Sequence, residues 1–501
     1  MQTMEHKNIV IFMTDHQRWD MMPPFDRCIT PNFDRLFRES KSFVNAYCPS
    51  PHCCPSRATF HSGLYPSEHG VWNNVNVGNT LSAGLTGDVR LWSQDLKEAG
   101  YRLLHCGKWH VSAEQGPEDF GWENIYGNEK YTGLTSGRAR PDPKEWKRYT
   151  ECHSDEAASY PGRQPGEILR EGYPPFRLYG ETEHPFRDDE TVDRAVEQVH
   201  ALAAETKPWV LYCGVLGPHD PYCVPKRFLD LYDPDAIELP ASYYDTMLDK
   251  PNLYRRTREK FGQLTPQETK DAIRHYLAFC SYEDALFGRL ADALRANGLY
   301  DDAIILCLSD HGDYAGEHGL FAKGLPCFRS AYHIPLMIRW PGLTTGDAGG
   351  RLIEDFVTLA DLAPTVLDMA GIAASRPFSG ASLRKLLAGV QDDFPRDAMY
   401  TQSNGNELYG IQRSVMTREW KYVYNGFDYD ELYHLSVDPD EMVNLSGDSR
   451  YRETKRELAK RLWQFAYDHG DVCVNPYVMV SLAEFGPGII FDDDVVTSSS
   501  I

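Results

Sequence analysis

Short, almost continuous apolar runs punctuate the first 340 residues of the chain. Runs of this length, apolar at nearly every position, are typical of strands that are buried on both faces of a parallel sheet. The pattern therefore predicts strands at residues 8–13, 101–106, 209–216, 303–308 and 334–338.

Stretches with helical spacing of apolar residues separate these predicted strands. The first begins at Thr30, where Pro31 occupies the first turn, as is common at helix starts. Others cover residues 91–99, 190–204 and 267–297. Helices alternating with buried strands are the mark of an α/β fold, so we expect a large, mostly parallel sheet sandwiched by helices.

The pattern changes near residue 390, where short aromatic runs begin to alternate with polar positions. This alternation predicts an antiparallel sheet, followed by a helix at residues 451–469 and an irregular tail. We therefore expect a catalytic domain at residues 1–388 and a smaller C-terminal α+β subdomain with a tail at residues 389–501. Residues 111–188 show little periodicity, and we interpret them as an insertion whose loop lines a substrate pocket.

Charge and composition narrow the range of partners. The net charge of −22, from 51 basic and 73 acidic residues, argues against nucleic acid or an anionic membrane surface as a partner. No apolar run is long enough to span a membrane, and no signal peptide is recognisable, which favours a cytoplasmic protein. The twelve cysteines are scattered without the spacing of a disulfide framework or a structural zinc site, which favours buried thiols.

Polar and charged residues follow the predicted strands. Asp15, Lys108 with His110, His219 and Asp310 each stand where a strand gives way to a loop. An aspartate in such a place is usually a turn residue when taken alone. The carboxyl ends of parallel strands meet at one edge of the sheet, however, and open α/β sheets bind their ligands there.

One short motif adds a reactive group to this set. The sequence Cys53-Cys54-Pro55-Ser56-Arg57 resembles the C-x-P-x-R signature of the type I, formylglycine-dependent sulfatases, in the alkaline phosphatase superfamily. The resemblance extends from residue 8 to about residue 445. It includes the segments 31–36, 107–110, 218–221, 309–312, 319–324, 361–365, 431–433 and 438–439.

The resemblance implies a nucleophile that the gene does not encode directly. Cys53 would be oxidised to formylglycine (3-oxoalanine) by a formylglycine-generating, sulfatase-maturating enzyme. The metal ligands would be Asp15, residue 53, Asp310 and His311, holding one divalent cation, Ca²⁺ before Mg²⁺ or Mn²⁺. Carboxylate oxygens are the hard ligands that these ions prefer, whereas a thiolate is soft, and conversion of Cys53 to an aldehyde hydrate removes that mismatch.

The remaining roles follow from position in the family pattern. Arg57 would hold the hydrated aldehyde, while Lys108 and Lys323 would neutralise charge on the sulfate oxygens. His110 would be the base that triggers sulfate release, and His219 the group that protonates or hydrogen-bonds the leaving oxygen.

Two further residues complete the predicted substrate contacts, which also include His219 and Lys323. Asn74 would donate a hydrogen bond to the substrate or else shape a turn. His16 stands where many sulfatases carry a second aspartate, and His311 where asparagine is commoner. With fewer carboxylates in the set, His16 is predicted either as a sulfate contact or as a metal ligand.

These features predict a sulfuric ester hydrolase that acts on a sulfated small molecule or saccharide, with a sulfated carbohydrate favoured. Aromatic residues of the insertion would either stack on a sugar or pack against the domain: Trp122, Tyr126, Tyr131, Trp146 and Tyr160. The main alternative is a phosphonate monoester or phosphodiester hydrolase on the same scaffold. Arylsulfatase-like or choline-sulfatase-like specificity and a non-catalytic sulfate-binding protein are weaker alternatives. A homo-oligomer is compatible with the sequence.

Overall fold

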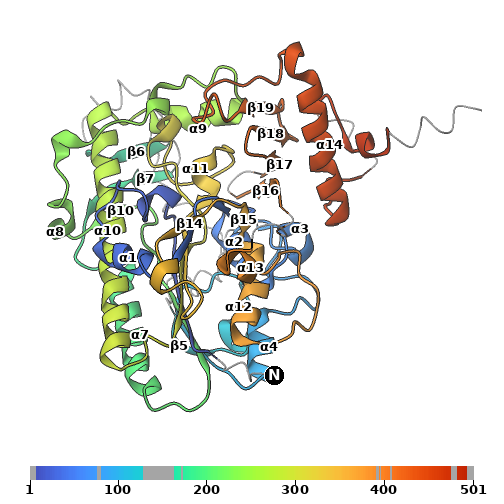
Figure 1. Cartoon of the computed structure of the whole chain (residues 1–501). Coiled ribbons are helices and arrows are strands. Elements are labelled where there is room, and N and C mark those ends of the chain that lie inside the picture. The colour runs from blue at the N-terminus through green and yellow to red at the C-terminus, as the bar shows by residue number, and fades with distance from the viewer. Residues whose placement is uncertain are drawn as a thin grey trace, which may run out of the picture.

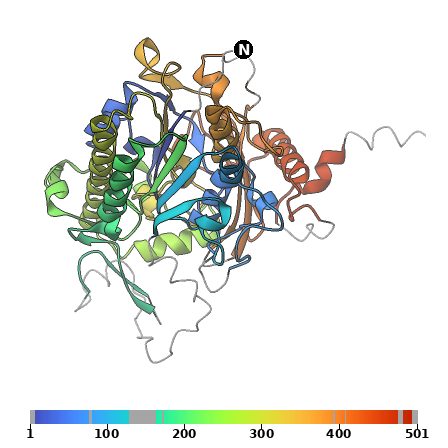
Figure 2. The same cartoon turned by 90° about the horizontal axis from the view of Figure 1, so that it is seen from below.

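An eight-stranded sheet forms the centre of the molecule, which is a computed structural model (Figures 1 and 2). The structure describes residues 7–75, 80–127, 163–170, 173–390, 394, 396–406, 409–475 and 482–492. The strands lie in the order β14 (Arg351–Ile353), β2 (Lys41–Phe43), β13 (Leu336–Arg339), β11 (Ile304–Ser309), β1 (Ile9–Thr14), β9 (Trp209–Gly214), β4 (Arg102–Gly107) and β5 (Glu123–Gly127).

The middle of this sheet is parallel, as the sequence predicts. Strands β11, β1, β9, β4 and β5 run in the same direction, each paired in parallel with its neighbour. The strand predicted at residues 334–338 is the exception within the core, because β13 pairs antiparallel with both β11 and β2. The sheet is therefore mixed at one side, while the strands that carry the candidate chemistry form its parallel centre.

Helices cover both faces of the sheet (Figures 1 and 2). One face packs against α1 (Pro31–Phe37), α7 (Asp188–Leu202) and α10 (Pro266–Ala296). The other packs against α2 (Cys53–Ser62), α4 (Trp92–Glu98) and α12 (Leu362–Ala370). Five further helices complete this part of the described chain: α3 (Pro66–His69), α8 (Lys226–Leu229), α9 (Asn252–Phe261), α11 (Arg329–Tyr332) and α13 (Arg384–Leu387).

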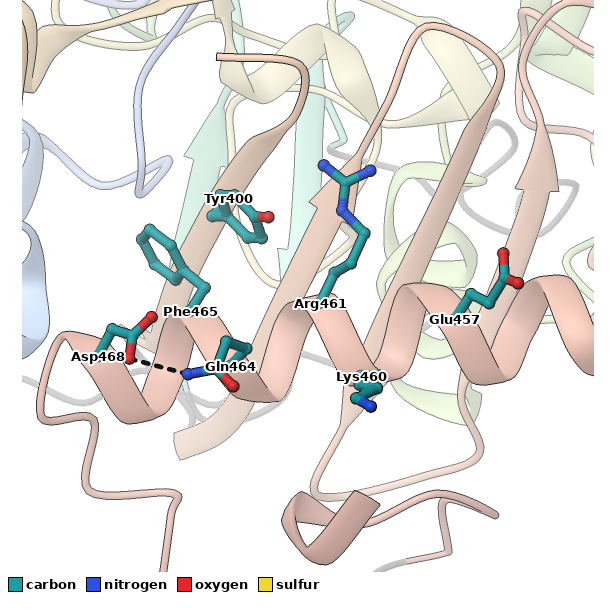
Figure 3. Close-up of a pocket in the computed structure, with 7 residues that line it drawn as sticks. All are labelled: Tyr400, Glu457, Lys460, Arg461, Gln464, Phe465 and Asp468. Carbon is teal, nitrogen blue, oxygen red and sulfur yellow. Dashed lines mark hydrogen bonds between the residues drawn. The ribbon is translucent and has the colours of Figure 1, made fainter. Parts of the chain in front are cut away.

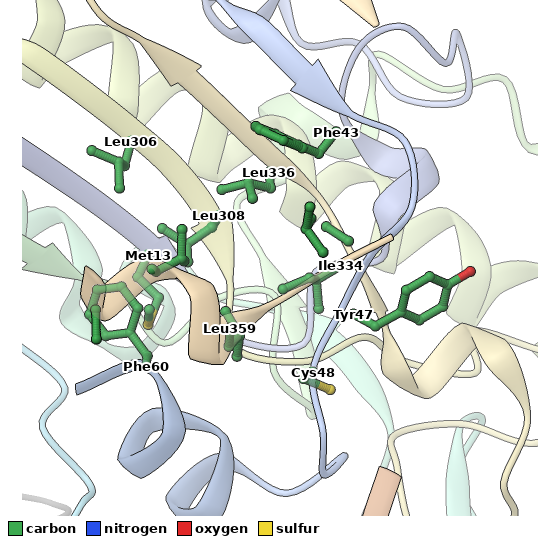
Figure 4. Close-up of a cluster of buried hydrophobic side chains, with 14 of the residues drawn as sticks. Met13, Phe43, Tyr47, Cys48, Phe60, Leu306, Leu308, Ile334, Leu336 and Leu359 are labelled. Carbon is green, nitrogen blue, oxygen red and sulfur yellow. The ribbon is translucent and has the colours of Figure 1, made fainter. Parts of the chain in front are cut away.

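The central sheet separates two apolar cores, one on each of its faces. In β1, Ile9, Ile11 and Met13 belong to the core beneath α2, whereas Val10 and Phe12 belong to the core beneath α10. Successive side chains of a strand point to opposite faces, so a strand that is apolar at every position fills both cores. Figure 4 shows the first core, where Met13 lies among Leu306, Leu308, Phe60 and Leu359.

The predicted insertion contains more regular structure than its sequence indicates. Besides β5, it forms a hairpin of β6 (Glu167–Arg170) and β7 (Tyr173–Arg177), and β8 (Tyr179–Glu181) pairs with β10 (Tyr222–Val224). These residues are therefore not all loop, and their strands of three to five residues are too short to show alternation in the sequence. That the segment lines a substrate pocket stays a prediction.

The aromatic residues of the insertion have different outcomes. Trp122 is only 4% exposed and packs edge-on against Trp92 and Tyr212, so it belongs to the core and not to a sugar-stacking surface. The Tyr126 hydroxyl donates to Glu190 Oε2 at 3.0 Å. Tyr131, Trp146 and Tyr160 lie outside the described residues.

A second, antiparallel sheet forms from the C-terminal region, as predicted. It contains β16 (Met399–Gly405), β17 (Tyr409–Met416), β18 (Trp420–Asn425) and β19 (Glu431–His434), and α14 (Arg452–Asp468) packs along it (Figure 1). The bend that follows β16 contacts the catalytic part of the chain, because the Asn74 amide donates to Asn406 Oδ1 at 3.0 Å. Two small strands, β3 (Ala46–Tyr47) and β15 (Val357–Thr358), form a third sheet with β12 (His333–Ile334).

Two further expectations concern the chain as a whole. Every cysteine in the described part of the chain is free, and Cys213 and Cys307 are fully buried within strands, as predicted. Among the described helices, none is both long and apolar enough to pass through a bilayer.

Candidate active site

Neighbouring strands of the parallel centre bring the predicted residues to one edge of the sheet. Asp15 and His16 follow β1, Asp310 and His311 follow β11 beside it, and Lys108 follows β4. His219 follows β9, which lies between β1 and β4. The prediction that these strand ends converge is confirmed by the contacts described below.

Cys53 is the first residue of α2, and its thiol points into this cluster. Its Sγ lies 3.7 Å from Asp15 Oδ1 and 3.3 Å from His311 Nε2. Burial opposes ionisation of the thiol, but Lys108, Lys323 and His311 hold its pKa well below the usual range. The start of a helix also favours an anion, because unpaired backbone N–H groups face it there. An anionic or strongly polar group at position 53 is therefore stabilised by its surroundings.

Asp15, Cys53, Asp310 and His311 form a compact set of donor atoms. One ligand atom from each lies within 4.8 Å of all the others. His311 Nδ1 donates to the Gly312 carbonyl at 2.9 Å, which leaves the Nε2 lone pair facing Asp15 Oδ1 at 3.4 Å and Asp310 Oδ1 at 3.6 Å. Two carboxylates and one imidazole suit a hard divalent cation, so this set fits the metal that the family implies.

Arg57 forms ion pairs with the carboxylates of both Asp15 and Asp310. Its Nε donates to Asp310 Oδ2 at 2.8 Å, and its Nη1 donates to the Tyr212 hydroxyl at 2.9 Å. Burial opposes ionisation of Asp15, but the cations around it, Lys108 and Arg57 among them, lower its pKa to about 2. Arg57 thus contacts Asp310, a carboxylate of the candidate metal site, and Tyr212. A contact between Arg57 and the hydrated residue 53 stays a prediction.

His16 is fixed by a residue that the sequence did not single out. Its Nδ1 donates to Asp313 Oδ2 at 2.9 Å, and the Tyr222 hydroxyl donates to the same carboxylate at 2.8 Å. Burial lowers the pKa of His16, and so do the nearby His219 and Lys323, so the ring is neutral. Its Nε2 is then an acceptor that faces Lys323 and lies 3.9 Å from Asp15 Oδ1. Both predicted roles for His16 remain open in this geometry.

Two histidines of the cluster have pKa values pushed in opposite directions. His110 hydrogen-bonds Cys53, and burial with the Lys108 charge lowers its pKa to about 4. The pKa of His219 is raised, because the Asp220 charge and a hydrogen bond to Cys53 outweigh burial and Lys323. Two imidazoles whose pKa values are pushed apart beside one reacting group are a pair suited to acid–base catalysis.

Backbone geometry and the two lysines complete the cluster. His16 and His110 have φ angles of 65° and 55°, a strained left-handed conformation that clusters at functional sites. Lys108 Nζ donates to Asp15 Oδ2, and Lys323 Nζ donates to His16 Nε2 and lies 3.3 Å from His219 Nε2. Both lysine charges thus act on Cys53, and both can meet an anionic group there.

Asn74 and His52 border the same helix start. The Asn74 side-chain carbonyl accepts from the Cys54 amide at 3.1 Å, so the residue contacts the first turn of α2, and its predicted contact with the substrate stays a prediction. His52 precedes Cys53 and is 1% exposed, and neither ring nitrogen has a hydrogen-bond partner among the described residues. No pattern in the sequence marks His52, Tyr222 or Tyr212, whereas Asp313 could have been noticed as the second aspartate of Asp310-His311-Gly312-Asp313.

A separate hollow lies on the outer C-terminal helix (Figure 3). It is lined by Tyr400, Glu457, Lys460, Arg461, Gln464, Phe465 and Asp468. All of these residues come from β16 and α14, and none belongs to the cluster around Cys53. The reaction is therefore assigned to the strand-end cluster and not to this hollow.

Comparisons with known proteins agree with the site. A family model described as Sulfatase matches residues 7–372, and one described as N-sulphoglucosamine sulphohydrolase, C-terminal, matches residues 316–468. The choline-sulfatase of Rhizobium meliloti is 29% identical over 88% of this chain and 83% of its own. Arylsulfatase K of Gallus gallus is 28% identical over 86% of this chain and 77% of its own.

Solved structures share the fold at lower identity. A phosphonate monoester hydrolase of Agrobacterium radiobacter superposes with a TM-score of 0.72 at 22% identity, over 92% of this chain and 96% of its own. A protein solved with its substrate D-glucosamine-2-N,6-O-disulfate superposes with a TM-score of 0.70 at 21% identity, over 93% of this chain and 99% of its own. Because the Sulfatase model covers well over half of the sequence, the chain belongs to the sulfatase family of the alkaline phosphatase superfamily and is a hydrolase of that family.

Proposed function

We propose that this protein hydrolyses sulfate monoesters with a nucleophile made from Cys53 by oxidation to formylglycine. The observation that carries the proposal is the position of Cys53 at the start of α2, facing Asp15, Asp310 and His311. Lys108 and Lys323 supply positive charge that acts on it. The C-x-P-x-R motif thus stands where an anionic sulfate group can be held and attacked.

The donor set supplies a chemical reason for converting Cys53. A thiolate is a soft ligand in a set that is otherwise suited to a hard cation, whereas the hydrate of an aldehyde offers oxygen. A bound Ca²⁺ or Mg²⁺ would act as a Lewis acid and lower the pKa of an oxygen nucleophile. Asp15, Asp310 and His311 would hold the ion, and Arg57 would keep Asp310 in its orientation.

The first step cleaves the ester. One hydroxyl of the hydrated residue 53 gives its proton to solvent and attacks sulfur, and the bond from sulfur to the ester oxygen breaks. The alcohol leaves with a proton from His219, which solvent then replaces. The raised pKa of His219 supports this assignment, because a protonated imidazole must be present when the leaving oxygen departs. Lys108 and Lys323 stabilise the charge that develops on the sulfate oxygens.

The second step releases sulfate. His110 takes the proton of the remaining hydroxyl, the carbon–oxygen bond to sulfate breaks, and the carbonyl of residue 53 returns. Water then hydrates the aldehyde, so that one ester and one water give one alcohol and one hydrogen sulfate. The lowered pKa of His110 supports its role, because the ring is neutral and ready to accept a proton at neutral pH.

Sulfated carbohydrate is the proposed substrate class. Support comes from the C-terminal match to N-sulphoglucosamine sulphohydrolase and from the structural neighbour that binds a disulfated glucosamine. The choline-sulfatase relative supports a sulfated small molecule instead. Turnover of a panel of sulfated mono- and disaccharides, measured beside choline sulfate and an aryl sulfate, decides between these classes. A preference for choline sulfate by orders of magnitude in kcat/KM would sink the carbohydrate assignment.

A phosphonate monoester or phosphodiester hydrolase is the second candidate. The neighbouring phosphonate monoester hydrolase favours it, since it shares the fold over nearly the whole chain. Lys108 and His110 favour sulfate, because the phosphonate hydrolases of this superfamily tend to carry neutral groups at these two positions. Parallel kinetics on an aryl sulfate and an aryl phosphonate test the ranking, and a much larger kcat/KM for the phosphonate would reverse it.

A further inference from the structure

The cluster around Cys53 contains a second set of donor atoms, which shares Asp15 and Cys53 with the first set but replaces Asp310 and His311 by two other histidines. Asp15, His16, Cys53 and His219 each offer one ligand atom, and these atoms all lie within 4.8 Å of one another. The set consists of one carboxylate, two imidazoles and a thiol. Imidazole and thiolate are the ligands that Zn²⁺ and similar borderline cations prefer over Ca²⁺ and Mg²⁺.

Hydrogen bonds hold both imidazoles in the orientation that a metal ligand requires. His16 Nδ1 donates to Asp313 Oδ2 at 2.9 Å, and His219 Nδ1 donates to the Asp220 carbonyl at 2.6 Å. Each ring therefore turns its Nε2 toward the cluster, and a metal ion binds the neutral form of both imidazoles. A histidine that donates its other nitrogen to a carboxylate or a carbonyl is the usual arrangement at zinc sites, because it fixes the tautomer and the ring orientation.

We infer that the unmodified chain, with Cys53 still a thiol, binds one Zn²⁺-type cation through Asp15, His16, Cys53 and His219. Conversion of Cys53 to formylglycine removes the thiolate and leaves oxygen ligands in its place. Maturation then changes the preference of the cluster from borderline cations to hard ones. The unmodified protein is a metal-binding species in its own right, and its site stands whether or not the proposed sulfatase reaction is correct.

Lys323 competes with this cation. Its ammonium group donates to His16 Nε2 and lies 3.3 Å from His219 Nε2, so it approaches the same two ring nitrogens. A cation bound there must displace the ammonium group, and the two positive charges repel each other. Removing the charge of Lys323 while keeping the length of its side chain is therefore expected to tighten zinc binding.

The test uses full-length protein made without the maturating enzyme, with Cys53 verified by peptide mass. Zn²⁺ affinity is measured by competition with a chromophoric chelator, and Co²⁺ is added separately to detect a thiolate-to-cobalt charge-transfer band. We expect one Zn²⁺ per chain, a visible thiolate band, and affinity at least about tenfold weaker in Cys53→Ser and in His16→Gln. Lys323→Met is expected to bind Zn²⁺ more tightly than the wild type.

Cys54→Ser is the matched control, since Cys54 is the adjacent buried thiol and contacts the Val75 amide instead of the cluster. It is expected to keep wild-type zinc affinity. Equal affinity in Cys53→Ser and wild type, or a cobalt complex without a thiolate band, would overturn the inference while leaving the activity of the matured enzyme untouched. Conversely, inactive matured protein with an intact zinc site would count against the sulfatase reaction alone.

Discussion

His16 Nδ1 and Asp313 Oδ2 lie 2.9 Å apart in a fully buried hydrogen bond. The carboxylate accepts a hydrogen bond from the Nδ1–H group, so that Nε2 is left as an acceptor that faces the reacting group. Asp313 also accepts from Tyr222 and from the Ala315 amide, which holds it in place. Asp313 thus determines which ring nitrogen His16 presents to the cluster around Cys53.

Substitution of Asp313 tests this relationship. In Asp313→Leu the Nδ1 proton of His16 loses its acceptor, and kcat/KM for a sulfate ester is expected to fall about 10–100-fold. Asp313→Asn retains an oxygen that can accept from His16 and is expected to lose less. Circular dichroism and thermal midpoints accompany the kinetics, and equal losses in both variants with unchanged folding would argue against a positioning role.

His219 is expected to matter most for poor leaving groups. His219→Gln removes the proton donor, and the loss in kcat/KM should reach about 10²–10⁴-fold for an alkyl or sugar sulfate. A nitrophenyl sulfate needs little help from an acid, so its loss should be much smaller. Rates for a series of aryl sulfates of rising phenol pKa check this. A loss of the same size for every leaving group would contradict the assignment.

The pH profile provides a second test of the two catalytic histidines. Because the His110 pKa is lowered to about 4, protonation of the base should reduce kcat/KM only in strongly acidic solution. The raised pKa of His219 places loss of the acid above the usual histidine range, so the alkaline limb should lie above about pH 6.5. In His219→Gln that alkaline limb should disappear, and a profile identical to the wild type would be inconsistent with an acid at this position.

Two buried histidines outside the site predict acid sensitivity of the fold. His61 and His105 lie in the aromatic core near Tyr212, and none of their ring nitrogens has a hydrogen-bond partner among the described residues. Burial lowers the pKa of His61 well below its usual value and that of His105 to about 3. The unfolded chain therefore binds more protons than the folded protein below about pH 6.5, so stability falls as the pH falls.

His105→Phe removes one of these titrations and keeps the ring stacked on Tyr212. The free energy of unfolding of the wild type should decrease with falling pH more steeply than that of the variant, by up to about 1.4 kcal/mol per pH unit between pH 6.5 and the lowered pKa. Urea unfolding at several pH values measures the difference. Parallel curves for the two proteins would show that His105 does not contribute.

Arg57 is expected to act through Asp310. Arg57→Lys keeps the charge but cannot donate to Asp310, Tyr212 and the Lys108 carbonyl together, as the planar guanidinium does. The divalent cation concentration that gives half-maximal activity should therefore rise, and the thermal midpoint should fall. A variant with unchanged metal dependence but reduced kcat would instead support the predicted contact between Arg57 and residue 53.

The sequence predicts the parallel centre of the fold well, because strands buried on both faces leave continuous apolar runs such as residues 8–13 and 303–308. It predicts Asp15, Lys108, Asp310 and His311 together because adjacent strands deliver their ends to one edge. Trp122 shows where prediction from the sequence stops. An aromatic residue in an irregular segment has the same local pattern whether it packs in a core or lines a pocket. Asp313, Tyr222 and His52 depend on contacts between distant segments, which no local pattern records.

The chemical identity of residue 53, cysteine or formylglycine, tests the central claim most directly. Protein made with and without the maturating enzyme is digested, and the peptide that carries residue 53 is examined by mass spectrometry beside turnover of a sulfate ester. The account predicts a peptide in which oxygen has replaced sulfur and two hydrogens are lost, with turnover proportional to the fraction converted. Full turnover by protein whose residue 53 is entirely cysteine would contradict it.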